Sequence, residues 1–193
     1  GCLGRMGQEL VKETIRNNRV NFTGGFEDSK HKNLNDQISN LISVNSDHIV
    51  SDNPKKIFSA SDVIIDFTTP QSTLNNVLLA SELKTPIVVG TTGLDEKIMD
   101  TIRKCSKNVP ILQSSNMSIG INLMFSLVKL AASKLRDVEY DIEIAETHHK
   151  YKVDSPSGTA ISLGEYAALG RSKNFNEVKN LDHINSSTKR QEG

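Results

Sequence analysis

The sequence predicts an α/β fold that begins with a parallel sheet and ends with a smaller α+β domain. Three short apolar runs, each followed by a helix or a polar turn, predict the parallel part, because βα units wind such a sheet. These runs are Val63–Phe67, Ile87–Val89 and Val109–Leu112. From Val138 onwards, apolar and charged residues alternate strictly, which predicts a half-buried antiparallel strand over residues 138–144.

Two helices are expected between the strands of the first domain. Thr69 can cap the first of them and Pro70 suits its first position, while the second lies behind Asp95. The residues at helical spacing are Leu74, Val77, Leu78 and Ser81 in the first helix and Leu94, Ile98, Ile102 and Cys105 in the second. The continuous apolar runs predict strands that are covered on both faces.

The rest of the chain is less regular. Residues 33–56 are polar and weakly periodic, so we expect a surface excursion with one short strand over His48–Val50. We place a domain boundary near residues 116–118, which divides a first domain of residues 1–117 from a second of residues 118–193. The first helix of the second domain is expected over Leu123–Leu135.

Composition excludes several classes of protein. The 193 residues carry 23 basic and 23 acidic side chains, whereas nucleic-acid binders normally have a basic excess and disordered chains a high net charge. A small molecule or another protein is therefore the expected partner. The two cysteines are far apart, which suits a reducing compartment. No apolar stretch is long enough to span a bilayer, so we expect a soluble cytoplasmic protein with no nucleic-acid or membrane partner.

A glycine-rich turn at the start resembles a dinucleotide-binding turn of the Rossmann type. Gly1, Gly4 and Gly7 are spaced G-x-x-G-x-x-G, and a helical pattern follows at once. Glu27 lies 20 residues beyond Gly7, where an acidic side chain can bind the adenosine ribose. Asp28 next to Glu27 would repel a 2′-phosphate, which favours NADH over NADPH, although Lys30 and Lys32 are close enough in sequence to reduce the repulsion. The alternative is a tight turn that happens to be rich in glycine.

Three loops follow the predicted strands and should line one site, because ligands bind outside the carboxyl ends of strands in such sheets. They are Thr68–Pro70, Gly90–Gly93 and Ser114–Asn116. Gly, Thr and Ser are also common in ordinary turns, which is the alternative interpretation.

The densest cluster of chemically active side chains is Glu146–Ala160. Adjacent histidines on an extended chain point to opposite sides, so His148 and His149 do not predict a metal site. His148, Lys150 and Lys152 have the same parity and can concentrate positive charge against an anion. Pro156 is expected near the first turn of a helix, which would place Ser157, Gly158 and Thr159 at its positive end as a carboxylate cradle. A capped helix after a solvated basic loop is the alternative.

Five motifs together resemble the dihydrodipicolinate reductase family, and they follow in order along nearly the whole chain. They are G-C-L-G-R-M-G at the start, D-F-T-x-P at Asp66–Pro70, G-T-T-G at Gly90–Gly93, S-N-M-S-I-G-I-N at Ser115–Asn122, and E-T-H-H-K-Y-K-V-D-S-P-S-G-T-A at Glu146–Ala160. The resemblance implies NAD(P)H-dependent reduction of 4-hydroxy-tetrahydrodipicolinate to tetrahydrodipicolinate in lysine and diaminopimelate biosynthesis. It also implies a homotetramer assembled through the second domain, and a strand before Gly1 and further chain after Gly193.

The resemblance also implies roles for individual residues. His148 and Lys152 would be the proton-donating catalytic residues. Substrate carboxylates would be bound by His149, Ser157, Gly158 and Thr159. The cofactor would be bound by Gly1, Cys2, Leu3, Gly4, Arg5, Met6, Glu27, Phe67, Thr68, Gly90, Thr91, Thr92, Ser114, Ser115, Asn116 and Met117. Two other functions are compatible with the residues: another Rossmann dehydrogenase of a small carboxylic acid, and an NAD-binding redox sensor.

Overall fold

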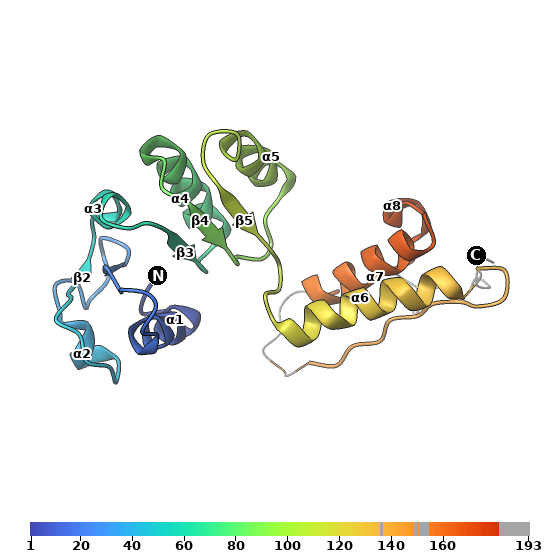
Figure 1. The fold of residues 1–193 in the computed structure, drawn as a ribbon, viewed down its shortest axis with the longest axis horizontal. Coiled ribbons are helices and arrows are strands. Elements are labelled where there is room, and N and C mark those ends of the chain that lie inside the picture. The colour runs from blue at the N-terminus through green and yellow to red at the C-terminus, as the bar shows by residue number, and fades with distance from the viewer. Residues whose placement is uncertain (136, 149, 151–154, 182–193) are drawn as a thin grey trace. The chain divides into compact units, whose positions relative to one another are not determined.

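A computed structural model describes residues 1–135, 137–148, 150 and 155–181 of the chain (Figure 1). The chain divides into two compact units, unit 1 with residues Gly1–Ser114 and unit 2 with residues Ser115–Gly193. Within the described ranges, no helix has the length and apolar character that crossing a membrane requires.

Unit 1 contains two parallel sheets, of strand order β1-β2 and β3-β4-β5. Ile64 pairs with Ile87 and Ile87 with Ile111, so the three longer strands run in step. The predicted parallel α/β fold is confirmed. The elements are α1 Arg5–Arg16, β1 Gly25–Phe26, α2 Ile38–Leu41, β2 Val50–Ser51, α3 Pro54–Ser59, β3 Ile64–Asp66, α4 Pro70–Leu83, β4 Ile87–Val89, α5 Glu96–Cys105 and β5 Ile111–Gln113.

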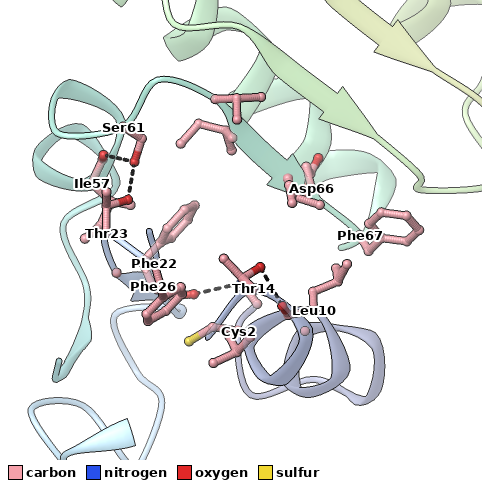
Figure 2. Close-up of a pocket in the computed structure, with 18 of the residues that line it drawn as sticks. Cys2, Leu10, Thr14, Phe22, Thr23, Phe26, Ile57, Ser61, Asp66 and Phe67 are labelled. Atoms are coloured by element: carbon pink, nitrogen blue, oxygen red, sulfur yellow. Dashed lines mark hydrogen bonds between the residues drawn. The ribbon is translucent and has the colours of Figure 1, made fainter. Parts of the chain in front are cut away.

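A cavity of about 210 Å³ lies between β1 and β3 and is lined mainly by apolar side chains (Figure 2). Phe22 and Phe26 line it from the side of β1, and Ile64 and Asp66 from β3. Its lining also includes Phe67 and Thr68, which follow β3, and Gly1, Cys2 and Gly7 of the glycine turn, so the cavity extends from the strand edges to the carboxyl end of β3. The glycine turn is attached beside it, because the backbone N–H of Cys2 donates to Phe26 O at 3.2 Å.

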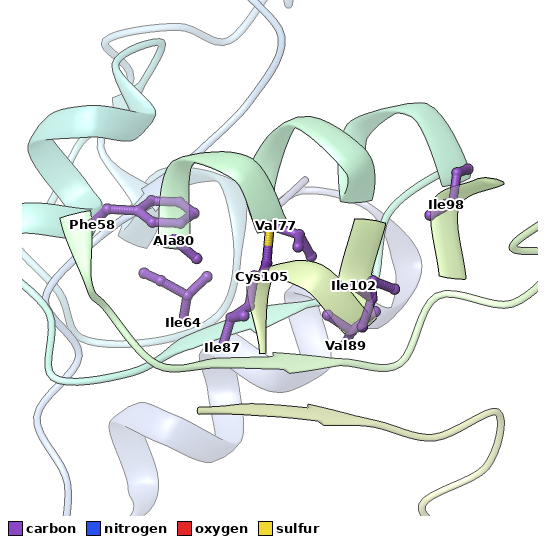
Figure 3. Packing of buried hydrophobic residues seen from close by; sticks show 9 residues of the cluster. All are labelled: Phe58, Ile64, Val77, Ala80, Ile87, Val89, Ile98, Ile102 and Cys105. Carbon is purple, nitrogen blue, oxygen red and sulfur yellow. The ribbon is translucent and has the colours of Figure 1, made fainter. Parts of the chain in front are cut away.

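The main core lies between the three-stranded sheet and its helices (Figure 3). Its buried members are Phe58, Ile64, Val77, Ala80, Ile87, Val89, Ile98, Ile102 and Cys105. Ile65 and Leu112 point to the other side and are 46% and 60% exposed. The prediction of strands covered on both faces is therefore wrong for the described residues, because α4 and α5 pack on the same face of β3 and β4.

Local capping explains where α4 and α5 begin. The Thr69 hydroxyl accepts from Ser72 N at 3.4 Å, and the Asp95 carboxylate accepts from Ile98 N at 2.8 Å. Both helices were predicted at these positions. The buried face of α4 is rotated from the predicted one, however, because Thr73, Asn76, Val77 and Ala80 are buried while Leu78 is 49% exposed.

The expected surface excursion over residues 33–56 proves to be partly core. Ile38, Ile42 and Val50 are each 3% exposed or less and pack with Cys2 and Val11. The predicted strand is present but shifted to β2, which pairs in parallel with β1. The sequence signal was weak because α2 is only one turn long, too short to produce a visible helical period.

Unit 2 is built on two packed helices, α6 Ile119–Lys134 and α7 Gly158–Gly170, with the short helix α8 Phe175–Val178 after them. The rings of Phe125 and Tyr166 stack at 5.1 Å between α6 and α7. A Cβ at Gly170 would lie 2.4 Å from Lys129 O, so the helices approach closely there. The helix predicted over 123–135 is confirmed and begins four residues earlier.

The strand predicted over residues 138–144 is not formed. Val138, Tyr140, Ile142 and Ile144 alternate as predicted, but they are between 40% and 80% exposed. A strand requires a neighbouring strand that accepts and donates its backbone hydrogen bonds. No segment that the structure describes in unit 2 provides this neighbour, so the apolar alternation is present without pairing.

Candidate active site

The glycine turn brings the backbone of the first residues against the start of α1. Gly4 N donates to Gly1 O at 3.2 Å, and the first helical bond runs from Gln8 N to Gly4 O at 2.9 Å. A Cβ on Gly7 would lie 2.1 Å from Gly1 O, so only glycine allows this approach. The N–H groups of residues 5–7 precede the first helical bond, as an anion-binding helix start requires. This geometry fits the pyrophosphate of a dinucleotide.

Glu27 lies against this turn. Its Oε1 atom accepts from Leu3 N at 2.6 Å, and Oε2 is 3.9 Å from the amino nitrogen of Gly1. The side chain is only 12% exposed. Asp28 next to it is exposed and accepts from Lys30 N at 2.9 Å within its own loop. The structure therefore brings the predicted ribose-binding carboxylate to the predicted pyrophosphate turn.

The remaining turn residues differ in exposure. Arg5 and Met6 are exposed at the start of α1, whereas Cys2 is 9% exposed. Burial raises the pKa of the Cys2 thiol to about 11. The thiol is therefore neutral near pH 7, and Cys2 can contribute backbone and packing to the turn but no reactive thiolate.

A buried polar network joins the first two predicted loops. Thr91 Oγ1 accepts from Thr68 N at 2.9 Å and from Thr73 Oγ1 at 2.8 Å. Asp66 Oδ1 accepts from Thr68 Oγ1 at 2.6 Å and from Asn76 Nδ2 at 3.3 Å. The network fixes the loop after β3 to the loop after β4. Sequence reasoning gave Asp66 no role, although a carboxylate that ends an apolar run was a signal for it.

The same strand ends contain a close contact between two predicted cofactor residues. A Cβ on Gly90 would lie 2.1 Å from Cε1 of Phe67, so the Phe67 ring lies against the Gly90 backbone. Ser114 N donates to Val89 O at 3.1 Å, which brings the third loop beside the second, and Thr92 is exposed. Phe67, Thr68, Gly90, Thr91, Thr92 and Ser114 thus lie at the carboxyl ends of β3, β4 and β5.

The other three predicted cofactor residues, Ser115, Asn116 and Met117, belong to unit 2. Two of them contact the start of α7. Ser115 Oγ lies 3.4 Å from Ser162 Oγ, and Asn116 Nδ2 donates to Thr159 Oγ1 at 3.4 Å. Residues predicted for the nicotinamide end and for the substrate therefore come together within one unit.

The segment predicted to form a carboxylate cradle begins α7 as a capped helix start. Ser157 is the N-cap residue, 3% exposed, and its Oγ accepts from Ala160 N at 3.0 Å. Gly158 and Thr159 follow in the first turn, where backbone N–H groups are available to an anion. Space beside Gly158 is open, because a Cβ there would meet no atom within 4 Å. Pro156 precedes the cap, as expected.

Glu146 connects this cap to His148. Its Oε1 accepts from Ser157 N at 2.8 Å, while Oε2 accepts from Ser157 Oγ and from His148 Nε2, the latter at 2.9 Å. Hydrogen bonds from His148 and then from Ser157 lower the pKa of Glu146 to about 2. Sequence reasoning assigned Glu146 no role. His149 and Lys152 lie outside the described residues, and Lys150 is exposed.

Both units match one family. Residues 1–117 match the family described as dihydrodipicolinate reductase, N-terminus, and residues 120–193 match dihydrodipicolinate reductase, C-terminus.

Known relatives agree with this match. The chain is 41% identical to a protein of Wolbachia pipientis wMel over 193 residues, covering 100% of this chain and 72% of the relative. It is 39% identical to a protein of Pelagibacter ubique, covering 96% of this chain and 67% of that relative. Both are named 4-hydroxy-tetrahydrodipicolinate reductase. Among solved structures, dipicolinate-bound dihydrodipicolinate reductase from Paenisporosarcina sp. TG-14 is similar, with a TM-score of 0.70 and 26% identity, covering 99% of this chain and 70% of that one.

Proposed function

Since the chain belongs to the dihydrodipicolinate reductase family, we propose that it reduces 4-hydroxy-tetrahydrodipicolinate to tetrahydrodipicolinate with NAD(P)H. The reaction is a step of lysine and diaminopimelate biosynthesis. The observation that carries the proposal is the match of both units, in order, to the two parts of this family, with relatives of the same name at 39–41% identity.

The cofactor site is proposed at the glycine turn and the strand ends of unit 1. Gly1–Met6 would hold the pyrophosphate, and Glu27 the ribose. The close approach of Gly7 to Gly1 and the contact between Glu27 and Leu3 support this placement. When bound, NAD(P)H supplies the hydride. We propose NADH as the preferred cofactor, because the exposed Asp28 carboxylate beside Glu27 would repel a 2′-phosphate.

The substrate site is proposed at the start of α7. The solved relative is described as dipicolinate-bound, and a dicarboxylate of this kind would suit N–H donors of residues 158–159 at the positive end of a helix. His149 would add a further donor. His148 and Lys152 would supply the proton that quenches the charge left on the ring after hydride delivery, because a cationic group close to developing negative charge stabilises it.

The arrangement of the whole protein is also proposed here. Residues 1–117 would form the dinucleotide-binding domain and residues 118–193 the substrate-binding and oligomerisation domain. We propose a cytoplasmic homotetramer, with the exposed apolar alternation at Val138–Ile144 as part of its interface.

The test is NADH oxidation by the full chain in the presence of the condensation product of aspartate semialdehyde and pyruvate. Substrate-dependent loss of NADH absorbance is the expected result. NADH binding without substrate-dependent oxidation would contradict the proposed reaction and favour a redox sensor. Parallel assays with NADPH measure the cofactor preference, and a higher kcat/KM with NADPH would overturn the preference for NADH.

A further inference from the structure

Glu146 contacts both His148, the proposed proton donor, and Ser157, which begins the proposed substrate cradle. Its carboxylate receives three hydrogen bonds, two from Ser157 and one from His148. The side chain is 28% exposed and that of His148 is 36% exposed, so both lie at the rim of unit 2. A single carboxylate can accept this many bonds because it has about four lone-pair sites.

The protonation of Glu146 determines the direction of these bonds. With a pKa of about 2, the group is a carboxylate near pH 7 and can only accept hydrogen bonds. His148 Nε2 must therefore carry a hydrogen and donate it to Glu146. In the neutral imidazole, the other nitrogen then has no hydrogen, because each neutral ring carries one. His148 can therefore supply a proton only as the imidazolium, which gives the Nδ1 hydrogen to the ligand and is left as the neutral Nε2–H tautomer.

Ser157 is constrained in the same way. Its hydroxyl hydrogen is donated to Glu146, and its oxygen accepts from Ala160 N at 3.0 Å. The backbone N–H of Ser157 also donates to Glu146 Oε1. These bonds leave Ser157 no donor for a substrate carboxylate, so its contribution is to begin α7 at the correct residue. The donors that face a ligand are then the N–H groups of residues 158 and 159.

We infer that Glu146 is a positioning residue that fixes the Nε2–H tautomer of His148 and, through Ser157, the start of α7. The inference rests on the proposed function for the roles of His148 and of the cradle. It goes beyond that function by naming the residue that holds them and the ring nitrogen, Nδ1, that transfers the proton.

The experiment compares Glu146→Gln with Glu165→Gln, which alters an exposed carboxylate on α7. The amide keeps the size of the side chain but has one acceptor atom in place of two. Four quantities are measured on the full chain: kcat, Kd for NADH, Kd for dipicolinate, and the ¹⁵N NMR tautomer of His148, assigned with His148→Gln. We expect Glu146→Gln to lower kcat roughly ten- to a hundredfold, weaken dipicolinate binding several-fold, and reduce the Nε2–H tautomer. NADH binding and the control should not change.

The outcomes separate this inference from the proposed function. If the wild-type chain does not oxidise NADH, the proposed function fails, while the tautomer still tests the inference. An unchanged Nε2–H tautomer in Glu146→Gln would overturn it. So would equal losses in NADH binding, dipicolinate binding and thermal stability, which a purely structural role predicts. In a His148→Ala background, Glu146→Gln should reduce kcat by much less than in wild type, and an undiminished reduction would also contradict it.

Discussion

Glu27 holds the backbone of Leu3 through a hydrogen bond of 2.6 Å, and thereby links the end of β1 to the glycine turn. Replacing Glu27 with Ala removes this bond as well as the proposed contact with the ribose. We expect a loss of about 1.5–3 kcal/mol in unfolding free energy, the usual contribution of a hydrogen bond to a charged group, and an NADH affinity at least about tenfold weaker. Urea unfolding and NADH fluorescence titration measure the two effects.

Glu13→Ala is the control for this change, because Glu13 is also acidic but is exposed on α1 and pairs with Arg16. It should alter neither quantity by a measurable amount, since exposed ion pairs contribute little. If Glu27→Ala were destabilised but bound NADH normally, Glu27 would support the turn without belonging to the cofactor site.

Gly7 allows no side chain. The Cβ of an alanine would lie 2.1 Å from Gly1 O and 2.8 Å from the Cys2 carbonyl carbon, which are backbone atoms that cannot rotate away. We expect Gly7→Ala to destabilise unit 1 by about 1–3 kcal/mol, as overpacking does, and to weaken NADH binding. Gly120→Ala in α6 is the matched control, because its Cβ has space and alanine favours helices. A Gly7→Ala protein as stable as wild type would show that the turn differs from this description.

Thr91 and Thr92 are neighbours in sequence with opposite surroundings. Thr91 is 4% exposed and accepts bonds from Thr68 N and Thr73 Oγ1, whereas Thr92 is exposed. Valine has the shape of threonine without its hydroxyl, so Thr91→Val removes the acceptor of a part-buried donor, Thr68 N, and of a buried one, Thr73 Oγ1. We expect a cost of about 1–3 kcal/mol for Thr91→Val and almost none for Thr92→Val in urea unfolding. Equal losses of unfolding free energy in the two variants would mean that water replaces the Thr91 hydroxyl.

Features determined by neighbouring residues were predicted correctly. Thr69 and Asp95 cap α4 and α5 through bonds to residues three positions later, so the signal lies within a few residues. The strand over 138–144 was predicted from alternation alone, yet a strand also needs a distant partner that no local pattern reveals. The buried Ile38 was missed for the same reason, since its burial depends on Val11 and Val50.

In the candidate site, too, local features were predicted and features that depend on distant residues were not. The glycine turn and the segment around His148 were recognised from short motifs. Glu146 was not assigned a role because its partner Ser157 is 11 residues away and contacts it only in the folded chain. Asp66 likewise bonds to Asn76, 10 residues later. In the sequence, a carboxylate that organises a site looks like any surface carboxylate, because the residues that donate hydrogen bonds to it are known only from the fold.

The low pKa of Glu146 predicts how the stability of unit 2 depends on pH. Hydrogen bonds from His148 and Ser157 lower this pKa from an ordinary 4.5 to about 2. A carboxyl group whose pKa is lower in the folded state stabilises the fold above its unfolded value and loses that contribution as pH falls through its folded value. We therefore expect a stability loss between pH 4.5 and about 2 that Glu146→Gln reduces.

Asp137 is the natural comparison, because its ion pair with Lys173 at 2.7 Å also lowers its pKa. Asp137→Asn should remove a separate part of the acid dependence of stability, so that the effects of the two variants on the unfolding free energy add. Chemical unfolding at a series of pH values, followed by tyrosine fluorescence to which Tyr166 between α6 and α7 contributes, measures each part. If Glu146→Gln left the acid limb of the stability curve unchanged, the carboxylate could not be holding His148 and Ser157 in solution, because protonation removes the charge that strengthens its three hydrogen bonds.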